Sequence, residues 1–94
     1  MAGDYCFSAD GPKPQKLLET ETLTTVLIGL EAGQKIPPHP APAAAYHFLE
    51  GSGWVIVDDS RLAVQPGATV VVPDGASRSV EAETQLAFLG VRAA

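Results

Sequence analysis

Residues 33–53 read GQKIPPHPAPAAAYHFLEGSG, and this stretch limits the folds open to the whole chain. Prolines fill four of the six positions 37–42 and surround His39. Because proline fixes φ and has no amide hydrogen to donate, the segment cannot be a central strand paired on both sides. We therefore expect an extended edge segment, or a crossing at a sheet rim, that leads into a strand containing Tyr46.

Beyond this stretch the chain is a succession of short apolar runs rich in Val, Leu, Ile and Thr. Turn-forming residues separate the runs at intervals of about 8–12 residues, which is typical of β-sandwiches and β-barrels. No window keeps apolar residues at helical spacing long enough to predict a helix. The sequence therefore predicts an all-β fold, with candidate strands at residues 17–19, 23–30, 46–49, 54–57, 62–64, 69–72, 78–80 and 84–91.

Two of the connections can be predicted in detail. Asp58, Asp59 and Ser60 form a short polar link between two apolar runs. This is typical of a tight hairpin, because Asp readily bonds its own backbone. Pro66 and Gly67 supply a fixed φ followed by a residue that can adopt a positive φ, which is what a type II turn requires.

The length of 94 residues predicts a single domain. Residues 1–15 contain glycine and proline without periodicity, so we expect an N-terminal arm there and one β-domain over residues 16–94. The first residues lack the positive charge and the apolar run of a signal peptide. The single cysteine, Cys6, excludes an internal disulfide. Both observations favour the cytoplasm as the location of the protein.

The charge pattern argues against two classes of partner. The net charge is −5, and the six Lys and Arg residues are scattered along the chain. Nucleic-acid binding needs a concentrated basic surface, so no nucleic-acid partner is expected. No apolar run approaches the ~20 residues that cross a bilayer as a helix, so no membrane partner is expected either.

A second stretch, residues 66–78, reads PGATVVVPDGASR. Its Gly67, Pro73 and Gly75 have the spacing of one signature motif of the cupin superfamily, and the glycines that frame residues 33–53 have the spacing of the other. The chain resembles a cupin over most of its length. The resemblance implies a double-stranded β-helix, also called a jelly roll or cupin-like barrel. It also implies a homodimer, since cupins commonly pair and a small barrel gains burial by doing so.

The resemblance further indicates where this family places its metal ligands. In one register His39 keeps the first histidine, whereas Ala41, Tyr46 and Arg78 stand where the family has a histidine, a glutamate and a histidine. A second register puts His39 at the second histidine and Ala44 at the glutamate, but the first motif glycine then no longer fits. In both registers His39 is the only standard ligand left in the first motif.

This set of side chains does not favour a metal cofactor. A catalytic iron, manganese or zinc ion normally takes three or more protein ligands from His, Cys, Asp and Glu. Alanine has no donor atom, and the positive charge of Arg78 opposes a divalent cation at its position. Tyr46 is the one alternative donor, because a phenolate can bind iron. We therefore expect no metal and no other cofactor.

The same positions outline a candidate ligand pocket. Alternation along a strand sends Tyr46 to one face and His47 to the other. If the glutamate position faces the barrel interior, Tyr46 points inward, and His47 joins the pocket only where a bulge shifts the strand. Arg78 is suited to hold a carboxylate through paired hydrogen bonds, although an exposed arginine or an internally paired one is an equal alternative. The candidate pocket residues are His39, Tyr46, Arg78, Trp54 and His47, with Phe48 and Phe88 as further apolar walls.

These patterns favour a metal-independent cupin-like barrel with a binding or accessory role, whose ligand is a small organic molecule and by preference an anion. One alternative is a metal-free isomerase, epimerase or lyase that uses His39 as base and Tyr46 as acid, because histidine exchanges protons near neutral pH. Another is a cupin metalloenzyme, a dioxygenase or isomerase, with non-standard ligands. A purely structural or regulatory homodimer is the fourth. The fold alone does not decide whether the protein is an enzyme.

Overall fold

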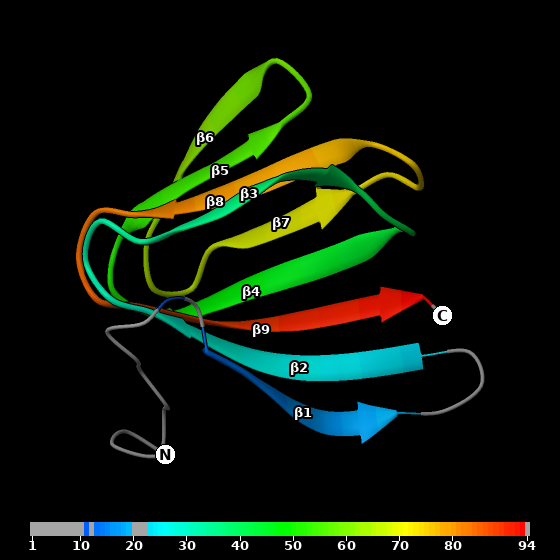
Figure 1. The fold of residues 1–94 in the computed structure, drawn as a ribbon, viewed down its shortest axis with the longest axis horizontal. Coiled ribbons are helices and arrows are strands. Elements are labelled where there is room, and N and C mark those ends of the chain that lie inside the picture. Colours follow the sequence, from blue (N-terminus) through cyan, green and yellow to red (C-terminus); the bar gives the residue numbers. More distant parts are fainter. Residues whose placement is uncertain (1–10, 12, 20–22, 94) are drawn as a thin grey trace.

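The computed structural model describes residues 11, 13–19 and 23–93, which form nine β-strands in two sheets (Figure 1). The larger sheet has the order β1 (Lys13–Glu19), β2 (Leu23–Leu30), β9 (Leu86–Ala93), β4 (Ala44–Glu50) and β7 (Thr69–Val72). The smaller sheet has the order β3 (Lys35–Pro40), β8 (Ser77–Ala82), β5 (Gly53–Val57) and β6 (Ser60–Val64). Every pair of neighbouring strands is antiparallel.

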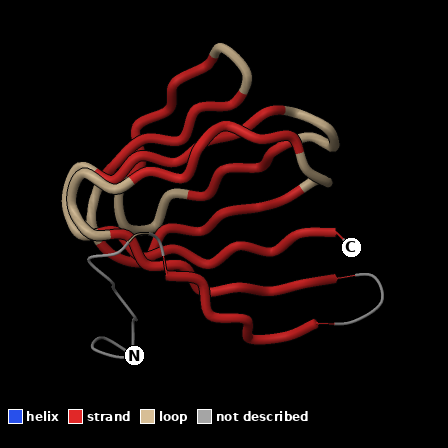
Figure 2. The backbone as a smooth tube through the Cα atoms, in the orientation of Figure 1, coloured by secondary structure: helices blue, strands red, loops and turns tan. Residues whose placement is uncertain are grey.

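The two sheets lie face to face, and their strands are joined by short loops at both ends (Figure 2). This arrangement confirms the predicted all-β fold of the jelly-roll type. None of the described residues forms a helix, so this part of the chain contains no helix that could cross a membrane.

The proline-rich segment forms β3, which is the edge strand of the smaller sheet and pairs only with β8. Its pairing register shifts between Ile36 and His39, where two consecutive prolines interrupt the ladder. The prediction of an edge segment is confirmed, and its physical reason is the missing amide hydrogens. Near the N-terminus, β1 begins at Lys13, inside the segment 1–15 that was expected to form an arm. The rest of that segment lies almost entirely outside the described residues.

The core lies between the sheets and is built from inward-facing residues of both, among them Phe48 on β4 and Phe88 on β9. Phe48 and Phe88 are paired across these strands, and their ring centroids are 4.9 Å apart. Both are fully buried, and the burial of each such side chain contributes about 1.5–3 kcal/mol to folding. Alternation along β4 directs Tyr46 toward the core and leaves His47 exposed. The predicted orientation of the Tyr46 strand is therefore confirmed.

Both turns have the predicted character. Asp58 has a positive φ of 51° in the tight link between β5 and β6. At the second turn, the backbone N–H of Ala68 donates to the carbonyl oxygen of Gln65 at 3.0 Å. Gly67 has a φ of 92° at the third position of this turn, as a type II turn requires.

Gly51, in the connection between β4 and β5, is required both by its backbone conformation and by close packing. Gly51 has a φ of 81°, which side-chain-bearing residues rarely adopt. A Cβ atom added there would overlap the carbonyl oxygen of Gln85 in the turn before β9. Gly51 therefore lets the β4–β5 connection pass directly against the β8–β9 connection.

This close approach predicts a difference between two glycine substitutions. Gly67→Ala adds a side chain in open space, so it should lose only the roughly 1–2 kcal/mol that a left-handed backbone costs. Gly51→Ala adds the same cost plus a collision with backbone, and should lose roughly 3 kcal/mol or more of unfolding free energy. Urea denaturation of both variants measures this difference. Equal midpoints for the two variants would show that the contact with Gln85 is not tight.

Candidate functional site

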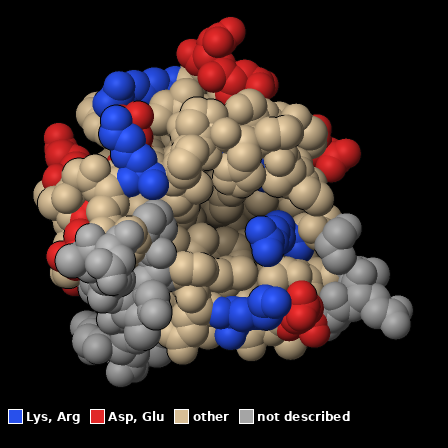
Figure 3. All heavy atoms as spheres, in the orientation of Figure 1, with Lys and Arg blue, Asp and Glu red and all other residues tan. Residues whose placement is uncertain are grey.

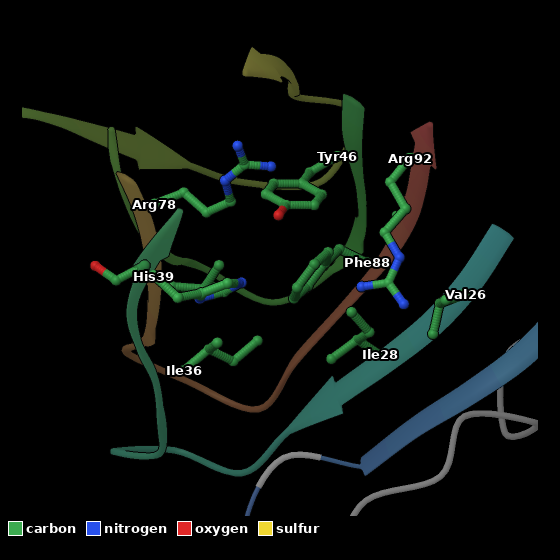
Figure 4. Close-up of a pocket in the computed structure, with 11 residues that line it drawn as sticks. Val26, Ile28, Ile36, His39, Tyr46, Arg78, Phe88 and Arg92 are labelled. Atoms are coloured by element: carbon green, nitrogen blue, oxygen red, sulfur yellow. The ribbon is translucent and has the colours of Figure 1, made fainter. Parts of the chain in front are cut away.

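A cavity of about 160 Å³ lies between the two sheets (Figure 4). Strands β2, β4 and β9 form its wall on the larger sheet, and β3 and β8 form its wall on the smaller sheet. Its apolar lining consists of Val26, Ile28, Ile36, Val80 and Phe88. Its remaining lining consists of His39, Tyr46, Arg78, Ser79, Gly90 and Arg92. A mainly apolar cavity with a few polar groups is the usual composition of a small-molecule site.

Arg78 lies on β8 and is buried, with 2% of its surface exposed. Its guanidinium donates to backbone carbonyl oxygens from two loops. Nη1 donates to Pro42 and Nη2 to Ala41, both at 2.7 Å. Nε and Nη2 donate to Ala76 at 3.1 and 2.9 Å, and Nη2 also donates to Pro73 at 3.3 Å. Arg78 therefore ties the β3–β4 loop to the β7–β8 loop.

This geometry matches the internally paired alternative for Arg78. Its hydrogen-bonding capacity is largely taken by the backbone, so little remains for a paired grip on a ligand carboxylate. Its positive charge, however, has no carboxylate partner among the described residues. Arg78 thus contributes positive potential to the cavity while its position is fixed by the loops.

His39 lies on β3 at the rim of the cavity, and its backbone pairs with that of Arg78. Its Nδ1 atom is 3.0 Å from the carbonyl oxygen of Pro37. Because a carbonyl oxygen can only accept, Nδ1 carries the hydrogen, and Nε2 of the uncharged ring keeps a lone pair. Figure 4 shows the ring of His39 extending toward the middle of the cavity. The backbone carbonyl therefore orients this imidazole, a role that carboxylates fill at many other sites.

Tyr46 forms part of the cavity wall opposite His39. Its ring meets Phe88 edge-on, with the centroids 5.3 Å apart and the planes at 67°. The hydroxyl of Tyr46 points into the cavity (Figure 4) and makes no hydrogen bond to any residue that the structure describes. It is therefore available to a ligand as a donor or an acceptor.

Arg92 also lines the cavity, although no motif marks it. It lies on β9 opposite Ala44, is exposed, and forms neither a hydrogen bond nor an ion pair with the described residues. In Figure 4 its guanidinium approaches Ile28 and Phe88 from the larger sheet. The sequence does contain a signal for Arg92. Alternate side chains of a strand face the same way, so Gly90 and Arg92 share the inward-facing side of Phe88.

Two of the predicted pocket residues lie elsewhere. His47 faces outward from β4 and is exposed, and its Nδ1 is 2.7 Å from Oγ1 of Thr69 on the neighbouring strand. No bulge shifts β4 at this point, so the alternation of side chains keeps His47 out of the cavity. Trp54 lies on β5 outside the cavity, where the guanidinium carbon of Arg61 is 4.4 Å from its ring centroid. The structure thus brings together His39, Tyr46 and Arg78 and leaves Trp54 and His47 apart.

The electrostatic character of the cavity is positive. Of the described residues that line it, two are arginines and none is Asp or Glu. Figure 3 shows the molecular surface hollowed on the face in view, with Lys and Arg atoms at the side of the hollow. The whole chain carries a net charge of −5, so this local excess of positive charge is opposite in sign to the rest of the molecule. Such a field favours a negatively charged ligand.

The donor set of the cavity does not fit a metal ion. No group of three or more His, Cys, Asp or Glu side chains comes together within the described ranges. The cavity offers one imidazole, one phenol and the hydroxyl of Ser79, and its lining includes the guanidiniums of Arg78 and Arg92. Cations at these positions repel a divalent metal, and a single imidazole with two hydroxyl groups is too weak a donor set to offset that repulsion.

The fold is shared with solved structures of cupins. An RmlC-like cupin from Desulfovibrio desulfuricans has a TM-score of 0.89 and 25% identity, and the match covers 99% of this chain and 92% of that one. By fold, the chain is a small member of the cupin superfamily. A protein of unknown function from Streptococcus pyogenes, SPY1581, has a TM-score of 0.86 and 24% identity over 95% of this cupin and 79% of that chain.

A third similar structure belongs to a much longer protein. Salicylate 1,2-dioxygenase from Pseudoaminobacter salicylatoxidans has a TM-score of 0.82 and 22% identity, and the match covers 89% of this cupin but 25% of the dioxygenase chain. At that identity the similarity concerns the fold alone. No protein-family model matches the sequence, and no curated protein matches it significantly.

The contacts of Arg78 predict that this cupin depends on it for stability. Arg78→Met should lower the unfolding free energy by about 3 kcal/mol or more, because it removes a buried charged donor and leaves several part-buried carbonyl oxygens without it. Arg92→Met is the matched control, since it removes the same group from an exposed position, and it should change stability by less than about 0.5 kcal/mol. Urea denaturation followed by Trp54 fluorescence reports both values. Similar losses in the two variants would contradict the structural role of Arg78.

Proposed function

We propose that this cupin is a metal-independent binding protein for a small organic anion, held in the cavity between the sheets. The guanidinium of Arg92 carries the proposal, because it forms no ion pair with the described residues and lies at an apolar cavity that none of their acidic side chains lines. A cation placed in this way beside an apolar surface is suited to a ligand with a carboxylate and an apolar body.

The remaining groups of the cavity support this role. The hydroxyl of Tyr46 and Nε2 of His39 are both available for hydrogen bonds at the cavity wall. Arg78 adds positive potential without being free to move, because its guanidinium is held by four carbonyl groups. Polar groups that are positioned before a ligand arrives lower the entropic cost of binding it.

A cytoplasmic location and a homodimer belong to the same proposal. Exposed apolar side chains on the outer strands, among them Leu18 on β1 and Val71 on β7, support an association of two copies. Val71 is 75% exposed, which is unusual for a branched apolar residue in a sheet. Burial of such side chains against a second copy would add to the limited core of a small domain.

One observation favours a second candidate, a metal-free enzyme that moves a proton. The Nδ1–H···O=C bond to Pro37 holds the ring of His39 with Nε2 toward the cavity, and the hydroxyl of Tyr46 faces the same space. A fixed base and a facing hydroxyl are the elements of proton abstraction and return at a carbon atom. An isomerase or epimerase reaction at a carbon next to a carboxylate would use both.

The binding proposal is tested by thermal denaturation with a panel of small carboxylates and the neutral amides of the same shape. At a concentration about ten times its Kd, a ligand adds about 1.4 kcal/mol, which raises Tm by roughly 5 °C or more in a domain of this size. Arg92→Met should remove most of the shift caused by carboxylates. Arg61→Met, which removes a guanidinium stacked on Trp54 outside the cavity, should leave the shift unchanged. Equal shifts by carboxylates and amides would contradict an anion site.

The enzyme candidate is tested by proton exchange with solvent. Each carboxylate that stabilises the protein is incubated with it in D₂O, and loss of the signal from the hydrogen next to the carboxylate is followed by ¹H NMR. His39→Gln should slow this exchange about 100-fold or more while the ligand still raises Tm. No exchange above the rate without protein would reject the enzyme candidate and leave the binding role.

A further inference from the structure

Among the described residues that line the cavity, Gly90 alone carries no side chain. It lies on β9, where its backbone is paired with Tyr46 of β4 on one side and with Val26 of β2 on the other. Phe88 and Arg92 precede and follow it on the same face of the strand. A glycine inside a strand weakens it, and it often marks a place where another group comes close to the backbone.

The backbone does not require glycine at this position. Gly51, Gly67 and the other turn glycines have positive φ angles, whereas Gly90 does not. A Cβ atom added to Gly90 would lie 3.5 Å from Cδ1 and Cε1 of Tyr46 and 3.8 Å from Cδ1 of Ile28. These are ordinary van der Waals contacts, so alanine would fit. What a larger side chain would remove is space from the cavity.

The size of that space limits the ligand. The cavity measures about 160 Å³. In another protein, a cavity of roughly 150 Å³ lined by Leu, Ile and Phe binds benzene. The walls near Gly90 are similarly apolar and partly aromatic, since they include Phe88, Ile28 and the ring of Tyr46. The volume of the space therefore matches one six-membered ring more closely than two fused rings.

The position of Arg92 indicates where a charged group of the ligand would lie. Arg92 follows Gly90 by two residues on the same face of β9, a separation of about 7 Å along the strand. Figure 4 shows its guanidinium directed toward Ile28 and Phe88. A ring over Gly90 would thus place a directly attached carboxylate within reach of the guanidinium of Arg92, which forms no ion pair with the described residues.

We propose that Gly90 is a specificity-determining residue, and that the cavity binds a monocyclic carboxylate with its ring at Gly90 and its carboxylate at Arg92. This inference rests on the proposed anion-binding function and names the class of ligand. The ring lies in the apolar part of the cavity, between Tyr46 and Ile28.

The experiment measures Kd by ¹⁵N–¹H NMR titration of the full chain with four probes. Benzoate has both a ring and a charge, benzyl alcohol has the ring without the charge, acetate has the charge without the ring, and 1-naphthoate has a second fused ring. The variants are Gly90→Ala, Gly90→Val and Arg92→Met. Ala63→Val, on the exposed strand β6 outside the cavity, is the control for added bulk.

We expect benzoate to bind the wild type at least about tenfold more tightly than acetate or 1-naphthoate. Gly90→Val should weaken benzoate and benzyl alcohol about tenfold or more, Gly90→Ala should weaken them less, and Ala63→Val should change neither. Arg92→Met should weaken benzoate while the Kd of benzyl alcohol stays within about twofold. If Gly90→Val fails to fold, the graded effect of Gly90→Ala against Ala63→Val decides the same point.

The two proposals fail in different ways. If benzoate binding depends on Arg92 but is insensitive to Gly90, or if acetate binds as tightly, the ring site is wrong and the anion-binding function stands. If benzyl alcohol binds as tightly as benzoate and only the Gly90 variants weaken either, the ring site stands and the anion preference is wrong. If no probe binds, or if 1-naphthoate binds as well as benzoate, the monocyclic assignment is overturned.

Discussion

The buried guanidinium of Arg78 holds one end of this barrel together. Two loops far apart in sequence, β3–β4 and β7–β8, present carbonyl oxygens that have no strand partner, and Arg78 supplies donors to both. The backbone N–H of Gly75 adds a direct bond to the carbonyl of Ala41 between the same loops. Hydrogen bonds to a charged donor are stronger than those between neutral groups. One arginine side chain can therefore join two loops that no strand pairing connects. The positions of β3 and β8, and therefore one wall of the cavity, follow from this interaction.

The two arginines of the cavity differ in how their guanidiniums are held. Arg78 is fixed and its hydrogen-bonding capacity is largely used, whereas Arg92 is exposed and unpaired among the described residues. Their charges add, because no acidic group lies in the cavity wall of the described chain. The same barrel framework that can hold a metal in other cupins here surrounds a positively charged, largely apolar space. A framework of this kind can therefore change its ligand class through a few side chains while the fold stays the same.

The fold was predictable because its signals are local. Proline at positions 37–42, the turn at Pro66 and Gly67, and the alternation through Tyr46 each depend on a few neighbouring residues. The site was predictable only in part, since His39, Tyr46 and Arg78 meet at the cavity but Trp54 and His47 do not. The hydrogen bonds of Arg78 involve carbonyl groups up to 37 residues away in the chain, and spacing does not reveal them. No motif marks Arg92, and its position at the cavity depends on the pairing of β9 with β4, which joins segments far apart in the sequence.

The prolines of β3 affect whether a second molecule can add a strand to the edge of the smaller sheet. An edge strand with free N–H and C=O groups is a template on which a second chain can add a strand, the first step toward fibrils and other open-ended assemblies. Pro37, Pro38 and Pro40 leave three of the six residues of this edge strand without an N–H to donate. Because His39 lies among them at the cavity rim, strand addition from a neighbouring molecule is disfavoured where it would cover the entrance. The same residues that end the sheet thus disfavour strand addition beside the cavity.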